Sequence, residues 1–228
     1  ILDDADPARV IEAALAEPDT TVAVFDSPDE REKWALMFEL AFTTGMRPGE
    51  RYGLMPYQLE LHHGIPIINV CQQAKPIPAG ATIPDWMEAE HLDGAIWLTK
   101  PKTAKGVRTV PIPQGLWDRL WTHIVKWGVP SHGLVFTNLY GHPIRRDNEE
   151  KRWRRALQAA GLPYVDIYSA RHWLATELAA AGASDEQRTA IMGHTDIHTT
   201  SVYTHWREQR LAETLESAIP DLGDGAKR

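Results

Sequence analysis

The chain has 228 residues, enough to bury one sizeable hydrophobic core. Its single cysteine, Cys71, excludes an intrachain disulfide and suits a reducing compartment. No apolar run approaches the ~20 residues of a membrane span, and no signal peptide is visible, so we expect a cytoplasmic protein with no membrane partner. The sequence starts with Ile-Leu-Asp rather than Met, which indicates a processed or truncated piece.

The formal net charge of −7 argues against a polyanionic partner, but the charge is unevenly distributed. Residues 1–50 hold four basic and twelve acidic side chains, so the remainder is nearly neutral. A basic cluster follows much later in the chain, and it is the candidate DNA-binding surface. Its members are Arg145, Arg146, Lys151, Arg152, Arg154 and Arg155.

The N-terminal part is predicted to be helical, with a short helix over 7–15 and a longer one between Ser27 and Gly45. Arg47 follows that glycine, and a proline after it opens another short helix. The guanidinium therefore lies near a helix N-terminus, where backbone N–H groups also favour an anion. Glu50, one turn later, is placed to hold Arg47 by a charge-assisted hydrogen bond.

The middle of the chain predicts a small antiparallel sheet. Residues 58–71 contain two strands around a His-His-Gly turn, and 75–93 form an irregular Pro/Gly-rich insertion. Strands over 95–98 and 107–112 are expected to form a hairpin, with Lys102 on its near arm.

Helical spacing returns in the C-terminal half, and the predicted helices cover 113–128, 147–160, 168–181, 184–192 and 206–219. The fold class is therefore mainly α with a small antiparallel β-sheet (α+β). Arg171 lies in the first turn of a largely buried helix and needs an anion partner. The structural alternative is an ion pair with Asp166 or Glu177.

Arg171, His194 and Tyr203 come from three consecutive short helices, which indicates a phosphate site with two donors and an attacking phenol. His194 and His198 are four residues apart, and His205 follows, so a metal site is the alternative interpretation. No H-E-x-x-H string exists and no Cys accompanies them, so we expect no metal and no cofactor.

These residues lie in motifs that resemble the signature of the tyrosine recombinase (phage integrase) family. The strings are TGMRPGE at 44–50, PKT at 101–103, RTVPI at 108–112, RHWLAT at 171–176 and IMGH at 191–194, with Tyr203 nine positions later. They cover roughly residues 30–210 in the family order. The resemblance implies the DNA breaking-rejoining fold of the catalytic domain.

The resemblance also implies a mechanism. Tyr203 attacks the scissile phosphorus and forms a 3′-phosphotyrosyl bond, while Arg47 and Arg171 hold the non-bridging oxygens. His194 adds a hydrogen bond, and Lys102 protonates the departing 5′-oxygen. No metal or ATP is needed.

Two positions weaken the match. Lys100 and Lys105 flank Lys102, which is favoured because it stands in the P-K-T string. Tyr168 occupies the position where the family usually has His; a phenol, with an ordinary pKa of ~10, is a poor base. We expect Tyr168 to donate to a phosphate oxygen, or to orient a water, and general-base assistance to be weak.

The expected organisation is an N-terminal helix and linker at 1–26, a catalytic domain at 27–205, and a C-terminal helix and tail at 206–228. The C-terminal helix either packs onto its own core or is exchanged between subunits. Implied partners are double-stranded DNA, a homotetramer assembled on it, and accessory DNA-bending or directionality proteins. A separate DNA-binding domain is expected to precede this piece.

The leading interpretation is a site-specific recombinase, or integrase, of a phage or other mobile element. The first alternative is a type IB topoisomerase-like relaxing activity with the same chemistry. The second is a catalytically silent DNA-binding module, which Tyr168 and the acidic balance favour.

Overall fold

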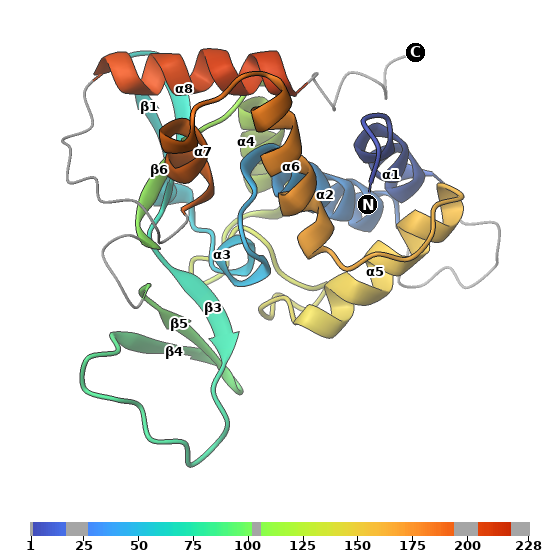
Figure 1. Cartoon of the computed structure of the whole chain (residues 1–228). Helices are drawn as coiled ribbons and strands as arrows, with labels where there is room; N and C mark the ends of the chain where they lie inside the picture. The colour runs from blue at the N-terminus through green and yellow to red at the C-terminus, as the bar shows by residue number, and fades with distance from the viewer. Residues whose placement is uncertain (1, 17–26, 102–105, 194–204, 220–228) are drawn as a thin grey trace.

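The computed structural model describes residues 2–16, 27–101, 106–193 and 205–219, and for 205–210 only the backbone path. Figure 1 shows helices gathered around a central helix, with strands on one side of them. The helices are α1 (Asp6–Leu15), α2 (Pro28–Thr44), α3 (Pro48–Tyr52), α4 (Gln114–Trp127), α5 (Arg146–Ala159), α6 (Tyr168–Ala180), α7 (Asp185–Met192) and α8 (His205–Ala218). The strands are β1 (Leu59–His62), β2 (Ile65–Val70), β3 (Gln73–Pro76), β4 (Ala89–Asp93), β5 (Ile96–Thr99) and β6 (Arg108–Pro111). The expected class, mainly α with a small antiparallel β-sheet (α+β), is confirmed, although the strands form two small sheets.

Helix α2 is the centre of the core and contacts α1, α4, α5 and α6. It begins where predicted, because the Ser27 hydroxyl accepts a hydrogen bond from the Glu30 N–H, and it ends at Gly45 with φ of 60°. Phe38 and Phe42 of α2 are fully buried and pack against aromatic rings of α5 and α6, at centroid distances of 5.2 to 5.8 Å. These aromatic contacts fix α5 and α6 on α2.

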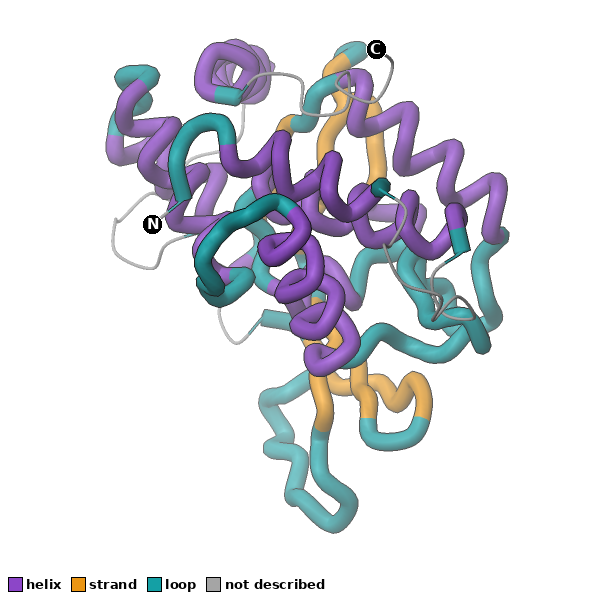
Figure 2. Tube along the Cα trace, turned by 90° about the vertical axis from the view of Figure 1, so that its right-hand side faces the viewer, coloured by secondary structure: helices purple, strands orange, loops and turns teal. Residues whose placement is uncertain are grey.

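The strands form two separate antiparallel sheets, with strand order β1-β2-β6 in the first and β3-β5-β4 in the second. The first sheet lies among the helices, whereas the second extends away from them, as the strands at the bottom of Figure 2 show. The segment 75–93 was expected to be irregular throughout, and that expectation is wrong at both its ends. Its beginning belongs to β3 and its end forms β4.

The predicted hairpin between 95–98 and 107–112 is also wrong, because β5 and β6 pair in different sheets. Strand β6 pairs with β2, and it also contacts α7 and α8. Pro101, which follows β5 closely, lacks the N–H that a continued ladder would need. Strand β5 instead lies between β3 and β4.

The second sheet is attached to α3 through a close backbone approach at Gly53. A Cβ atom at this glycine would lie 2.7 Å from the backbone nitrogen of Ala74, so a larger residue would force α3 and β3 apart. The Gln72 side chain donates to the Gly53 carbonyl oxygen at 2.7 Å. The second sheet, which contains both ends of the insertion, is therefore anchored to the core at α3.

Along the described part of the chain, we find no helix with the length and apolar character needed to cross a bilayer.

Candidate active site

Four of the residues predicted for the phosphate site lie in described parts of the chain: Arg47, Glu50, Tyr168 and Arg171. Arg47 is the residue before α3, Glu50 is in α3, and Tyr168 and Arg171 are in the first turn of α6. The other three predicted residues, Lys102, His194 and Tyr203, lie outside the described residues.

Arg47 is held at the start of α3 by Glu50, as predicted. The Glu50 carboxylate accepts from the Arg47 backbone N–H at 2.8 Å and from Arg47 Nη1 at 3.0 Å. The Arg47 side chain remains 41% exposed, whereas that of Glu50 is buried. This arrangement leaves much of one guanidinium open to a ligand while a buried carboxylate orients it.

Arg171 is buried, with 8% of its surface exposed, and it joins the ends of two helices. Its Nη1 donates to the carbonyl oxygen of Gly45 at 2.5 Å, and its Nη2 donates to that of Met192. The alternative of an ion pair with Asp166 or Glu177 does not match these contacts, and Asp166 instead faces Arg146 at 3.4 Å.

The pKa of Arg171 is affected by the other charged residues of the site. Burial is the main reason why the pKa of Arg171 falls to about 10, and the positive charges of Arg47 and Arg108 lower it further. Glu50 and Tyr168 act on the pKa of Arg171 in the opposite direction. An anion bound among these cations would therefore be stabilised by two neighbouring guanidiniums.

Arg108, the first residue of β6, is the site residue that the sequence analysis missed. Its Nη1 and Nη2 donate to the two Glu50 carboxylate oxygens at 3.1 and 2.9 Å, and its Nε donates to the Ile191 carbonyl oxygen at 2.9 Å. Only 3% of its surface is exposed. The sole signal in the sequence was its place in the RTVPI string, which says nothing about its partner.

The pKa of Glu50 reflects these contacts. Burial alone would raise it, but hydrogen bonding and charge from Arg108, followed by Arg47, outweigh that effect and leave the pKa below its ordinary value. Glu50 is thus held as a carboxylate between two arginines.

The C-terminal end of α7 lies against the same arginines. Arg108 and Arg171 donate to the carbonyl groups of Ile191 and Met192, in the last turn, where the helix dipole favours positive charge. Gly193 ends the helix with φ of 66°, and a Cβ there would lie 2.9 Å from Arg108 Cδ. Gly193, the last described residue before position 194, therefore lies against Arg108, which together with Arg47 and Arg171 forms what we call the arginine cluster.

Tyr168 opens α6 one turn before Arg171 and is 40% exposed. Its backbone N–H donates to the Asp166 carboxylate at 2.9 Å, which fixes the start of the helix. Its phenol therefore lies at the rim of the cluster and not in the core.

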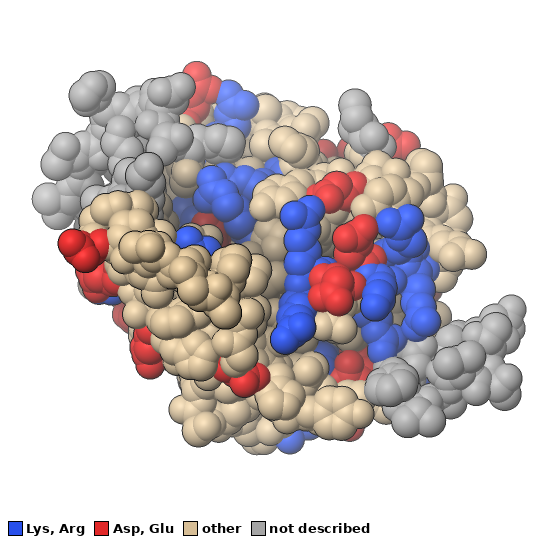
Figure 3. All heavy atoms as spheres, turned by 90° about the horizontal axis from the view of Figure 1, so that it is seen from below, with Lys and Arg blue, Asp and Glu red and all other residues tan. Residues whose placement is uncertain are grey.

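The predicted basic cluster lies on and just before α5, with five exposed members and a half-buried Arg152. In Figure 3 Lys and Arg gather toward the right of the face, with carboxylates among them, and a second group lies further left. Arg154, for example, pairs with Glu150 at 3.1 Å and lies over the Tyr164 ring at 4.2 Å. The positive face is thus partly neutralised along the helix.

A buried network joins α3 to α5. Glu149 accepts from Arg51 Nη2 at 2.6 Å and from the Tyr52 hydroxyl at 2.5 Å, and Arg51 Nη1 donates to the Met46 carbonyl at 2.6 Å. Burial, together with the Glu149 charge, raises the pKa of Tyr52 well above its ordinary value. The helix that carries Glu50 is therefore fixed to the helix that carries the basic cluster.

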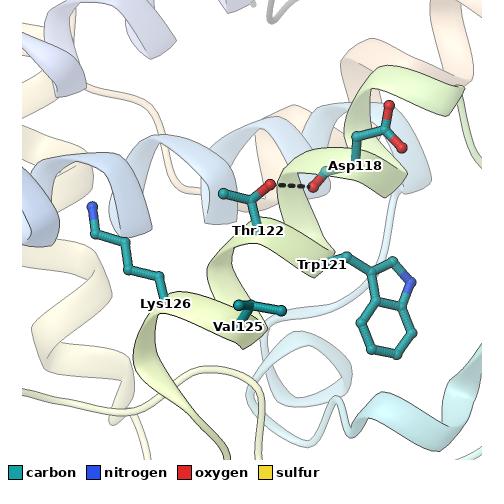
Figure 4. A pocket seen from close by; sticks show the side chains of 5 residues that line it. All are labelled: Asp118, Trp121, Thr122, Val125 and Lys126. Carbon is teal, nitrogen blue, oxygen red and sulfur yellow. Dashed lines mark hydrogen bonds between the residues drawn. The ribbon is translucent and has the colours of Figure 1, made fainter.

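A shallow hollow of about 510 Å³ lies along α4 and is lined by Asp118, Trp121, Thr122, Val125 and Lys126. Figure 4 shows these side chains spread along the helix and not converging on one point. The hollow shares no residue with the arginine cluster. Among the described residues, no group of three His, Cys, Asp or Glu side chains could hold a metal ion; His194 and His198 lie outside them.

The sequence is similar to a known protein family and to curated proteins. A model of the phage integrase family matches residues 9–210. A "Tyrosine recombinase XerC-like" protein of Caldanaerobacter subterraneus subsp. tengcongensis is 31% identical over 79% of this chain and 48% of its own length. A "Tyrosine recombinase XerD" of Lacticaseibacillus casei is 26% identical over 92% of this chain and 61% of its own length. The chain therefore spans about half to three fifths of these curated relatives.

Solved structures match the fold as well. The Tn1549 transposon integrase in complex with transposon right-end DNA has a TM-score of 0.61 at 18% identity, over 92% of this chain and 63% of that one. The XerH site-specific recombinase bound to its difH substrate, in a pre-cleavage complex, has a TM-score of 0.60 at 17% identity, over 99% of this chain and 52% of that one. At this level of identity the structural likeness establishes the fold.

Proposed function

This chain belongs to the phage integrase family, and from that premise we propose that it is the catalytic part of a site-specific DNA recombinase. The observation that carries the proposal is the arginine cluster, in which Arg171 donates to the Gly45 carbonyl oxygen, two residues before Arg47, while Arg47 contacts Glu50. A half-exposed guanidinium next to a buried, oriented one is suited to the two non-bridging oxygens of a phosphodiester.

The proposed reaction is a transesterification at phosphorus. The Tyr203 oxygen attacks, a phosphotyrosyl bond forms to the 3′ side, and the bond from phosphorus to the 5′-oxygen breaks. Lys102 gives the departing oxygen a proton, and His194 donates a further hydrogen bond to the phosphate. The reverse attack, by a 5′-hydroxyl of a partner strand, rejoins the DNA and conserves the bond energy.

The two described arginines are suited to different parts of this task. Arg171 uses two of its five N–H donors on backbone carbonyls, so it is fixed in place and has donors left for an anion. Arg47 keeps an open side chain. Both would stabilise the charge that grows on the equatorial oxygens in the transition state.

We propose double-stranded DNA as the partner, bound across the face that carries the arginine cluster and the basic residues of α5. The matched structures of the Tn1549 integrase and of XerH are complexes with transposon right-end DNA and with the difH substrate, which supports this choice. A tetramer on DNA, accessory DNA-bending or directionality proteins, and a cytoplasmic location are further parts of the proposal. The division at residues 26 and 205 also remains a prediction.

Helix α8 bears on how the subunits assemble. Its Leu211 and Leu215, and Ile219 directly after it, are buried, and the helix lies against α6, β6 and β2 of the same chain. Gln187 of α7 donates to the Thr214 hydroxyl at 2.9 Å. We propose that the free chain keeps α8 on its own core and that α8 is exchanged between subunits only on assembly.

The test is a covalent-capture assay on a duplex with a nick just 3′ of the scissile phosphate, so that the short 5′-hydroxyl fragment diffuses away. The wild-type chain is expected to form a protein–DNA adduct, and Tyr203→Phe, which lacks the nucleophilic oxygen, is expected to form none. An adduct of equal yield from both proteins would place the nucleophile elsewhere. No adduct from either would favour the silent DNA-binding module, the alternative that Tyr168 supports.

A further inference from the structure

We propose that Arg108 is a positioning residue for strand cleavage. It holds the Glu50 carboxylate, and with it Arg47, at a fixed position relative to the C-terminal end of α7. This inference rests on the proposed function and names a residue that the reaction scheme above does not use. Arg108 directs its Nε, Nη1 and Nη2 at Ile191 and Glu50 and is almost fully buried, so its guanidinium acts through these groups and not on the phosphate.

The hydrogen-bond pattern requires a guanidinium. Arg108 makes three bonds from its planar group, two to the Glu50 carboxylate and one from Nε to the Ile191 carbonyl oxygen. A lysine ammonium is a single point donor on a flexible stem and cannot reproduce this fork. The side chain therefore connects β6, α3 and α7 with a geometry that only arginine provides.

Each Glu50 oxygen is shared between Arg108 and Arg47. One oxygen accepts Arg108 Nη1 at 3.1 Å and Arg47 Nη1 at 3.0 Å, and the other accepts Arg108 Nη2 at 2.9 Å and the Arg47 backbone N–H at 2.8 Å. The two hydrogen bonds from Arg108 thus fix the orientation of the Glu50 carboxylate, and the carboxylate fixes Arg47. Without the fork, the carboxylate could turn about its last torsion and Arg47, with its half-exposed side chain, would turn with it.

The end of α7 depends on the same side chain. Gly193 has no Cβ, which allows the Arg108 stem to pass beneath it, and the Ile191 carbonyl accepts from Nε. Arg108 therefore sets the distance between Arg47 and the point where the chain continues to His194. A shift of ~1 Å in such a group can cost on the order of 100-fold in rate.

Arg108 also lies on β6, the strand that follows the segment with Lys102. An effect of Arg108 on cleavage through Lys102 therefore has to be separated from an effect through Glu50 and Arg47. If Arg108 acted through Lys102, its loss would impair protonation of the leaving oxygen. If it acts through Glu50 and Arg47, its loss impairs stabilisation of the charged phosphorus centre instead.

The first experiment measures the single-turnover rate of adduct formation on the nicked duplex at saturating DNA, for Arg108→Lys. We expect this maximal rate to fall about 100-fold, with the half-saturating DNA concentration within about 2-fold of wild type. The matched control is Arg119→Lys, which breaks another two-pronged Arg–carboxylate pair, with Glu39 on α2. The control should lose thermal stability and keep its maximal rate. A wild-type rate for Arg108→Lys would overturn the proposal.

The second experiment replaces the 5′-bridging oxygen by sulfur, because a thiolate leaves without a proton near neutral pH far more readily than an alkoxide does. Lys102→Ala is expected to regain most of its rate on the sulfur substrate, whereas Arg108→Lys is expected to stay slow. Recovery of Arg108→Lys would show that it acts through the leaving group and would overturn the route through Glu50.

A second variant covers the case in which Arg108→Lys fails to fold. Glu50→Asp keeps the charge but shortens the side chain, so the carboxylate cannot meet Arg108 and Arg47 at once, and a similar loss of maximal rate is expected. The double variant should be no slower than the slower single variant, since both changes break one linkage. A wild-type rate for Glu50→Asp, or independent losses that multiply, would contradict the proposal. Absence of any adduct from the wild type would refute the proposed function itself, and this inference with it.

Discussion

Arg171 reaches carbonyl groups at the ends of two helices, Gly45 after α2 and Met192 in the last turn of α7. Arg47 follows the first of these points by two residues, and position 194 follows the second by the same interval. A single buried side chain therefore aligns two chain segments that carry predicted catalytic groups. Burial of its guanidinium is tolerated because donors on it are satisfied by these carbonyls.

Tyr168 is the residue where the site departs from the family pattern, and it lies exposed at the rim, one turn before Arg171. We predict that Tyr168→His increases the single-turnover rate of adduct formation, because a neutral imidazole can accept the proton of the attacking phenol. The gain should rise with pH through the ordinary imidazole pKa of ~6.5 and then level off.

The control for this change is Tyr168→Phe, which removes the hydroxyl but supplies no base. If Tyr168 donates to a phosphate oxygen, this variant should be slower than wild type at every pH. Equal rates for Tyr168→His and wild type across the pH range would show that no general base is missing at this position.

At the scale of elements, His123 shows how α4 is fastened to its neighbours. Its buried ring lies against that of Phe136, with 5.1 Å between the two ring centroids, and its Nε2 lies 3.2 Å from the Val135 carbonyl oxygen. Val135 and Phe136 are themselves buried. Helix α4 is thereby packed on the buried segment that precedes α5.

The stability of this packing should depend on pH. Burial lowers the pKa of His123 to about 4, and the positive charges of Lys33 and Lys126 add to the effect, against the hydrogen bond to Val135 and the charge of Glu32. The unfolded chain, with an ordinary histidine pKa of ~6.5, therefore binds the proton first as the pH falls. We predict that protonation of His123 lowers the free energy of unfolding as the pH falls from about 6.5 to 4. The total loss should be on the order of 3 kcal/mol.

The variant His123→Gln keeps an N–H donor near Val135 but cannot titrate. Urea unfolding curves between about pH 4 and 8 should show a weaker pH dependence than the wild type. His172→Gln, a change at an exposed residue of α6, serves as the control. If His123→Gln and wild type lose stability in parallel as the pH falls, His123 is not the group responsible.

For the whole molecule, the charge distribution decides how DNA can bind. The net charge is −7, but Lys and Arg side chains still gather on the face shown in Figure 3. Lys151 and Arg155 are exposed on α5. DNA affinity should therefore come from a few local phosphate contacts, and log K should fall linearly with log salt by about 0.9 for each contact.

We predict that Lys151→Ala and Arg155→Ala each weaken DNA binding on any sequence and reduce the slope of log K against log salt by about 1. The control is Lys126→Ala on α4, whose ammonium pairs with Asp29 at 2.7 Å and Glu32 at 2.6 Å. Fluorescence anisotropy at several salt concentrations measures the slope. An unchanged slope in both α5 variants, or an equal change in the control, would place the DNA on another face.

The sequence by itself determined the helices and the identity of the candidate site. Caps such as Ser27 with Glu30, or Ser184 with Gln187, join residues three positions apart, so the local order of residues specifies them. The contact between Arg47 and Glu50 is of the same local kind.

Only the tertiary structure decided which distant groups meet. The β5 strand pairs with β3 and β4 and not with β6, and Arg108 binds Glu50, 58 positions away, and Ile191, 83 positions away. Strand pairing and the choice of an ionic partner depend on which surfaces the packed helices leave available, and no spacing within the sequence encodes this. The motifs therefore identified Arg47, Arg171 and Glu50 of this site, while the packing of α3, β6 and α7 determined how they are held.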